Sequence, residues 1–207
     1  MHDTTETSGL RERKKAETRA ALSAAALNLA VERGVDAITA DEIAAAANVS
    51  VRTFHNYFAS KEEALLAPFR AVLRDAADRL LARPADEPIL DALEGVWVDL
   101  ASREAVPAET KAQVDRLWTS PHMAAYQHRL IEEAVRLFIP VVAARTGTDP
   151  VHDLYPNLVT AASVAAIFTA LEHRPGRELT HEERVPLVHE GFDLLRSGLR
   201  RPGTTVT

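Results

Sequence analysis

The feature that most constrains the fold is a series of three helical patterns between Arg13 and Tyr57. The first is long and ends at about Arg33, and its apolar residues recur at three- and four-residue steps on one face: Leu22, Ala26, Leu29 and Ala30. Gly34 then follows at the position where helices commonly end in the left-handed conformation. The chain therefore begins with a long amphipathic helix.

The second and third patterns are short and lie close together. Thr39 and Glu42 have the S/T-x-x-E spacing of a capping box, which predicts a helix that ends near Asn48. Ser50 is placed to cap a further short helix that runs to Tyr57. Two short helices joined by a tight turn, behind a longer helix, predict a helix-turn-helix unit.

The rest of the chain also reads as helix. Glycine is scarce, with 8 in 207 residues, and few runs alternate apolar with polar residues, so we expect an all-α protein. Ser60 and Glu63 repeat the capping-box spacing and begin a long helix to about Ala82. Further helical patterns cover residues 88–103, 107–119, 121–145, 151–173 and 180–199.

These patterns predict a domain organisation. We expect a disordered N-terminal arm over residues 1–12, a helix-turn-helix domain over 13–62, a larger helical domain over 63–200 and a disordered tail over 201–207. The absence of cysteine excludes disulfides, thiolate metal ligands and cysteine nucleophiles.

Targeting signals and charge narrow the function classes. The N-terminus lacks the apolar region of a secretory signal, and the longest apolar stretch is too short to span a bilayer, so we expect a cytoplasmic protein without a membrane partner. The net charge is −6, but through Lys61 there are eight Lys/Arg and eight Asp/Glu. The acidic excess therefore lies in the C-terminal part.

Residues 43–61 contain no acid and hold the third helical pattern. Val51, Phe54 and Phe58 form its anchoring face, which leaves the polar groups for a partner. Arg52 suits a guanine edge, the Thr53 methyl a thymine, and Asn56 an adenine or a phosphate. Phosphate contacts are expected of His55, Tyr57, Lys61 and the helix-capping Thr39. Because a polyanion repels carboxylates, the segment predicts DNA binding, and a solvated helix face capped by Ser50 is the alternative.

A basic run precedes this unit, formed by Arg11, Arg13, Lys14, Lys15 and Arg19. It is either a flexible arm that reaches the adjacent groove and backbone, or the solvated start of the first helix.

Residues 13–65 resemble the DNA-binding domain of the tetracycline-repressor (TetR) family. The resemblance rests on the long helix ending in Gly34, the stretch TADEIAAAANVS and the stretch VRTFHNYFASKEEAL. In that family, the positions that usually touch DNA correspond here to Thr39, Ser50, Arg52, Thr53, Asn56, Tyr57 and Lys61. His55 replaces the more usual tyrosine.

Residues 66–200 resemble the variable region of the same family, which implies an effector cavity and a four-helix dimer interface from the last two helices. The dimerisation residues implied are Ala162, Ala166, Val185, Val188, Phe192 and Leu195. The ligand-binding candidates are Trp97, Leu100, Trp118, Met123, Tyr126, Leu130, Phe138 and Phe168. Packing within one chain is the alternative for both sets.

The segment from Arg116 to Ser163 resembles the branch named for acyl-CoA-like ligands and mycofactocin regulation. That branch implies an acyl chain among the apolar residues, with Arg116, His128 or Arg129 near a polar head. A free fatty acid, a drug-like molecule or no natural ligand are left open.

We therefore expect a ligand-responsive transcription regulator that binds a palindromic operator as a homodimer. A repressor is favoured over an activator. A carrier or enzyme with a vestigial head, and an unregulated nucleoid-type binder, are the alternatives. No histidine pair has the i, i+4 spacing of a helical metal site, and no nucleophile motif is present, so no metal, cofactor or catalysis is expected.

Overall fold

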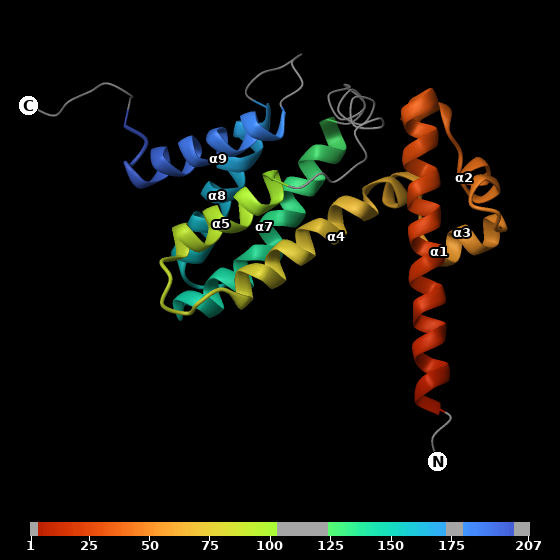
Figure 1. Ribbon diagram of the computed structural model, residues 1–207, viewed down its shortest axis with the longest axis horizontal. Coiled ribbons are helices and arrows are strands. Elements are labelled where there is room, and N and C mark those ends of the chain that lie inside the picture. Colours follow the sequence, from red (N-terminus) through yellow and green to blue (C-terminus); the bar gives the residue numbers. More distant parts are fainter. Residues whose placement is uncertain (1–3, 103–123, 173–179, 201–207) are drawn as a thin grey trace, which may run out of the picture. The chain divides into compact units, whose positions relative to one another are not determined.

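The computed structural model describes residues 4–102, 124–172 and 180–200, and every regular element there is helical (Figure 1). The elements are α1 (Thr4–Arg33), η1 (Val35–Ala37), α2 (Ala40–Ala46), α3 (Val51–Tyr57), α4 (Lys61–Ala82), α5 (Ile89–Ala101), α7 (Ala124–Thr146), α8 (Leu154–Glu172) and α9 (His181–Arg196). The expected all-α fold is confirmed. The helix expected at 107–119 and the tail at 201–207 lie outside the described residues.

The chain divides into two compact units, which are described separately. The first runs to Arg70 and contains α1, η1, α2, α3 and the first turns of α4, together with Tyr126. The second begins at Ala71 and contains the rest of α4, most of α7, and α5, α8 and α9.

The N-terminal arm that was expected to be disordered is helical from Thr4 onward, because α1 extends over thirty residues. The stretch contains no proline. Arg13 and Glu17, whose charged groups lie 3.6 Å apart, form the i, i+4 ion pair that supports an exposed helix. The prediction of a disordered arm is therefore wrong for the described part of residues 1–12.

In the first unit, α1, α2 and α3 pack around a small apolar core (Figure 1). Its largest fully buried side chains are Phe54, Phe58, Leu22, Ile38, Ile43, Leu65 and Leu66. Gly34 has φ 85° and ψ 153°, so the positive φ expected at this glycine is present but its backbone is extended and not left-handed helical. A side chain at this position would be strained.

The second unit is built on α5, which packs against α8 and α9. Trp97 of α5 and Phe138 of α7 are both fully buried, with stacked rings whose centroids lie 4.9 Å apart. Such aromatic pairs contribute about 0.5–1.5 kcal/mol beyond the area they bury. The stack fixes α5 to α7 at the centre of this unit.

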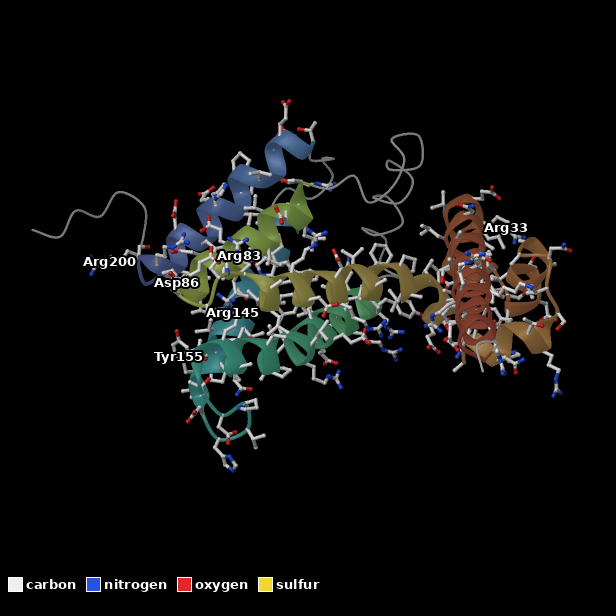
Figure 2. The ribbon with its side chains drawn as sticks, turned by 60° about the horizontal axis from the view of Figure 1, so that its bottom comes forward. Arg33, Arg83, Asp86, Arg145, Tyr155 and Arg200 are labelled. Carbon is white, nitrogen blue, oxygen red and sulfur yellow. The ribbon has the colours of Figure 1, made fainter. Side chains whose placement is uncertain are left out.

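Helix α8 is apolar on two faces. One face is buried and includes Val164 and Ile167, whereas the other leaves Leu154 76%, Tyr155 47% and Leu158 60% exposed. Tyr155 is labelled in Figure 2. Val151, just before the helix, is 80% exposed. These exposed residues recur at three- and four-residue steps and form the outer stripe of α8, which Ala161 and Ala165 continue. Over the described residues, no helix is both long and apolar enough to cross a membrane.

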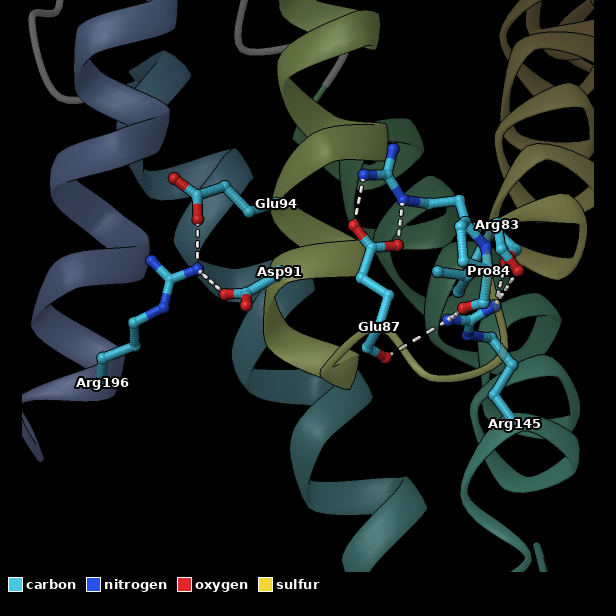
Figure 3. A network of polar contacts seen from close by, with 8 residues as sticks. Arg83, Pro84, Glu87, Asp91, Glu94, Arg145 and Arg196 are labelled. Atoms are coloured by element: carbon cyan, nitrogen blue, oxygen red, sulfur yellow. Dashed lines mark hydrogen bonds and ion pairs between the residues drawn. The ribbon is translucent and has the colours of Figure 1, made fainter.

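Arg83 and Glu87 form an ion pair in the second unit (Figure 3), and the Arg83 guanidinium lies beside Gly95. The Arg83 guanidinium donates to both carboxylate oxygens of Glu87, at 2.7 and 2.6 Å. This contact raises the pKa of Arg83 and lowers that of Glu87. A Cβ atom on residue 95 would lie 2.5 Å from an Arg83 nitrogen, so the guanidinium occupies the space that a side chain there would fill.

Arg145, in the last turn of α7, binds the C-terminal end of α4 (Figure 3). Its guanidinium donates to the carbonyl oxygens of Leu80, Arg83 and Pro84 at 3.1, 2.7 and 2.8 Å, with a longer contact to Glu87. The last carbonyls of a helix have no partner within it, so Arg145 satisfies groups that would otherwise need water.

We expect Arg145→Ala to lower the free energy of unfolding by about 2–3 kcal/mol, because several charge-assisted hydrogen bonds to one helix end are lost together. Denaturant unfolding followed by circular dichroism measures the change. Arg136→Ala, which removes an exposed arginine from the same helix, is the control and should stay within about 0.5 kcal/mol of the wild type. Equal losses in the two variants would contradict the capping role.

Candidate DNA-binding surface

Helix α3 separates an anchoring face from an outward face, as its sequence predicts. Phe54 and Phe58 are buried to 0% and 1% exposure and lie with ring centroids 5.9 Å apart. The outward face gathers the candidate DNA-binding residues of this helix: Ser50, Arg52, His55 and Asn56 are exposed, and Thr53 and Tyr57 are half-buried. A short helix with six polar side chains on one surface is suited to a DNA groove.

The turn between α2 and α3 explains why α3 begins at Val51. Asn48 has φ 55°, a left-handed conformation that asparagine adopts more readily than most residues. The amide of Val49 donates to Ala44 and that of Asn48 to Ala45, which closes α2 with a Schellman motif. The Ser50 hydroxyl then accepts from the Thr53 amide at 3.0 Å and caps α3.

Arg19 of α1 holds the other end of α3. It donates to the Tyr57 carbonyl oxygen at 2.8 Å, and its guanidinium carbon lies 4.2 Å from the centre of the Phe58 ring. The sequence grouped Arg19 with a possible DNA-binding arm, and the structure corrects this, because the side chain stabilises the recognition helix instead. Its position three residues before the buried Leu22, on the packed face of α1, was the available signal.

Lys61 also acts within the protein. Its ammonium group donates to the carbonyl oxygens of Val35 and Ile38, both at 2.9 Å, and approaches that of Asp36 at 3.5 Å. The expected phosphate ligand thus ties the first turn of α4 to the connection between α1 and α2. Backbone carbonyl partners of this kind leave no pattern in the sequence, and a phosphate contact of Lys61 stays a prediction.

Thr39 caps α2 in the predicted capping box. The Glu42 amide donates to the Thr39 hydroxyl at 3.3 Å, and both the amide and the hydroxyl of Thr39 donate to Glu42 at 2.9 Å. A hydrogen bond from Arg33, followed by those from Thr39, lowers the pKa of Glu42. A carboxylate already occupies this helix start, so a phosphate contact of Thr39 stays a prediction.

The effector candidates do not form one group in the structure. Trp97, Phe138 and Leu130 are buried in the second unit, where Leu100 and Phe168 are half-buried. Tyr126 belongs to the first unit and hydrogen-bonds Glu62. Trp118 and Met123 lie outside the described residues.

Three polar atoms in the second unit are buried without a hydrogen-bond partner among the described residues: Trp97 Nε1, Arg145 Nε and Thr160 Oγ1. The side chains of Trp97 and Thr160 are fully buried. Such orphaned groups are rare in folded proteins and mark places that a ligand or water can satisfy. In the described ranges, no cluster of His, Asp or Glu side chains is placed to hold a metal ion.

The dimerisation candidates need correction. Val188 and Phe192 of α9 are fully buried within the single chain, and a Cβ atom on Gly191 would lie only 3.4 Å from that of Ala166. Val188 and Phe192 are therefore packed within one chain, whereas Ala166 is half-buried and its dimer role stays a prediction. Ala162, Val185 and Leu195 are half-buried. Apart from Leu81 and Leu199, the large apolar side chains left exposed in the described residues belong to the outer stripe of α8.

Comparisons with known proteins cover both parts of the chain. Residues 22–67 match the family model described as bacterial regulatory proteins of the tetR family, and residues 87–200 match the MftR C-terminal domain. The HTH-type transcriptional regulator TcmR of Streptomyces glaucescens is 33% identical over 212 residues, which cover 94% of this chain and 92% of the relative.

Solved structures agree on the fold. FadR of Thermus thermophilus, a TetR-family repressor solved in complex with lauroyl-CoA, matches with a TM-score of 0.52 and 23% identity over 91% of this chain and all of that one. NalD of Pseudomonas aeruginosa, the secondary repressor of a multidrug efflux pump, matches with a TM-score of 0.53 and 18% identity over 87% of this chain and 96% of its own.

Proposed function

Since the chain belongs to the TetR family and is a DNA-binding transcription regulator, not an enzyme, we propose that it represses transcription as a homodimer on a palindromic operator. A small, largely apolar effector, of the acyl-CoA or fatty-acid kind, releases it from DNA. The observation that carries the proposal is the outward face of α3. Its polar side chains are exposed or half-buried, whereas Phe54 and Phe58 on the opposite face are buried.

On this face, Arg52 and Asn56 are the proposed base readers, and Ser50, Thr53, His55 and Tyr57 position the helix on the backbone. Arg52 is exposed and lies in the first turn of α3, and a guanidinium can bind guanine O6 and N7 together. Tyr57 is half-buried at the last turn, with a hydroxyl suited to a phosphate.

We expect Arg52→Ala to relax base preference at one position per half-site and to cost about 1–3 kcal/mol on the preferred sequence. Tyr57→Phe should instead weaken binding to all sequences alike. Selection from random duplexes, followed by affinity measurements at fixed salt, separates the two effects. An unchanged selected motif for Arg52→Ala would mean that Arg52 reads no base.

The proposed dimer forms through the outer stripe of α8. A soluble single chain seldom exposes several large apolar side chains in one row. In a two-fold symmetric dimer, the row on one copy would pack against the same row on the other, so both would be covered. A dimer also suits helix-turn-helix heads, because they bind half-sites about one helical turn apart, roughly 34–36 Å.

We expect Leu158→Asp to shift the protein to a monomer in sedimentation experiments and to weaken operator binding, because it places a charge in the apolar contact. Leu81→Asp is the matched control, since Leu81 of α4 is similarly exposed, at 57%. It should leave the dimer unchanged. A dimer that survives Leu158→Asp would place the interface elsewhere.

The proposed effector lies beside Trp97 in the second unit. The stacked Trp97–Phe138 pair offers apolar surface, and its indole N–H, which has no hydrogen-bond partner in the described part of the chain, favours a ligand with an acceptor such as an acyl carbonyl. Effector and DNA affinities would then be reciprocally coupled, by roughly 1–3 kcal/mol.

Mass spectrometry of material extracted from the purified protein identifies the candidate effector, which is then tested for operator release. We expect Trp97→Phe to raise the concentration needed for half-release about tenfold, because one buried hydrogen bond is lost. Operator affinity without effector should stay unchanged. Equal half-release in both proteins would exclude a role for the indole.

A further inference from the structure

The N-terminal part of α1 carries cations that the core of the first unit does not use. Arg11, Lys14 and Lys15 are exposed, and no hydrogen bond or ion pair joins their side chains to another described side chain. Because α1 begins at Thr4, these residues lie on a rigid helix and not on a flexible arm. Their directions are therefore fixed by the same helix that packs against α2.

Two of these cations lie on the packed side of α1. Arg11, Lys15 and Arg19 follow at four-residue steps, and the buried Leu22 and Ala26 continue the same side. Arg13 and Glu17 point the other way, since they lie about half a turn from this stripe, and they pair with each other at 3.6 Å. The Arg13–Glu17 ion pair therefore lies on the face of α1 opposite the stripe that holds Arg11, Lys15 and Arg19.

Arg19 fixes where this stripe lies relative to the proposed recognition helix. Its guanidinium contacts the Tyr57 carbonyl, in the last residue of α3. At 1.5 Å per residue, Lys15 follows about 6 Å and Arg11 about 12 Å further along α1. The two cations therefore lie on α1 about 6 and 12 Å from the residue that contacts the C-terminal end of α3.

We propose that this part of α1 is a second DNA contact, in which Arg11 and Lys15 bind backbone phosphates flanking the sequence that α3 reads. The inference rests on the proposed DNA-binding role of α3. Duplex DNA presents one charge per about 1.7 Å of axis, so cations spaced along a helix find phosphates without base recognition. A membrane surface is the wrong partner, because residues 4–15 contain a single large apolar residue, Leu10.

The test compares Arg11→Gln/Lys15→Gln with the control Arg13→Gln on a duplex selected by the wild-type protein from random DNA. Affinity is measured by fluorescence anisotropy from 50 to 300 mM salt. The double variant should bind about tenfold more weakly near 150 mM, with a salt slope smaller by about 2, since each lost phosphate contact removes about 0.9. Arg13→Gln should stay within about twofold of the wild type.

Duplex length provides a second measurement. Extending the selected site by about ten base pairs on each side should tighten binding of the wild type and of Arg13→Gln, but not of the double variant. Circular dichroism confirms that all three proteins keep their helix content. Equal salt slopes for the double variant and Arg13→Gln, or equal gains from the longer duplex, would overturn the proposal.

A different result would contradict the proposed function itself. If the wild-type protein binds all duplexes with the same affinity, it is not a sequence-specific repressor. The salt slopes of the two variants on the same duplex still decide whether Arg11 and Lys15 meet phosphate.

Discussion

Helix α4 is held at both ends by cations that donate to backbone carbonyls, and much of the fold depends on these contacts. Lys61 in its first turn binds the connection between α1 and α2, whereas Arg145 of α7 binds its last carbonyls. The carboxylate of Glu63 also accepts from the Ala59 amide at 2.8 Å, just before the helix. Lys61 and its partners lie in the first unit, and Arg145 and its partners lie in the second, so each end of α4 is fixed within its own unit.

The same principle governs the recognition helix. Ser50 caps its start and Arg19 binds its end, so both termini of a seven-residue helix are satisfied by side chains. Helices this short are not stable alone, and tertiary contacts must hold them. The outward polar residues are thereby presented on a pre-ordered surface, which reduces the entropy lost when DNA binds.

Local signals in the sequence predicted the helix-turn-helix unit well. Capping residues and the buried Phe54 and Phe58 define α3 to the residue, because they act within a few positions along the chain. Long-range partners were missed: Arg19 and Lys61 are ordinary cations in sequence, and only the folded backbone supplies their carbonyls. On α8, apolar residues cover the whole circumference, so the pattern does not tell the core face from the exposed face. On α9, Val188 and Phe192 belong to an apolar stripe, and such a stripe can pack on a helix of the same chain or of a partner, so the sequence did not show that both are buried within one chain.

The Arg83–Glu87 pair beside Gly95 couples three positions of the sequence. A Cβ atom on residue 95 would lie 2.5 Å from an Arg83 nitrogen, so the guanidinium must shift to admit any side chain there. Because the same guanidinium binds Glu87 through two nitrogens, that shift also changes the ion pair. The effect of a substitution at residue 95 therefore depends on which residues stand at positions 83 and 87, and such effects are not additive.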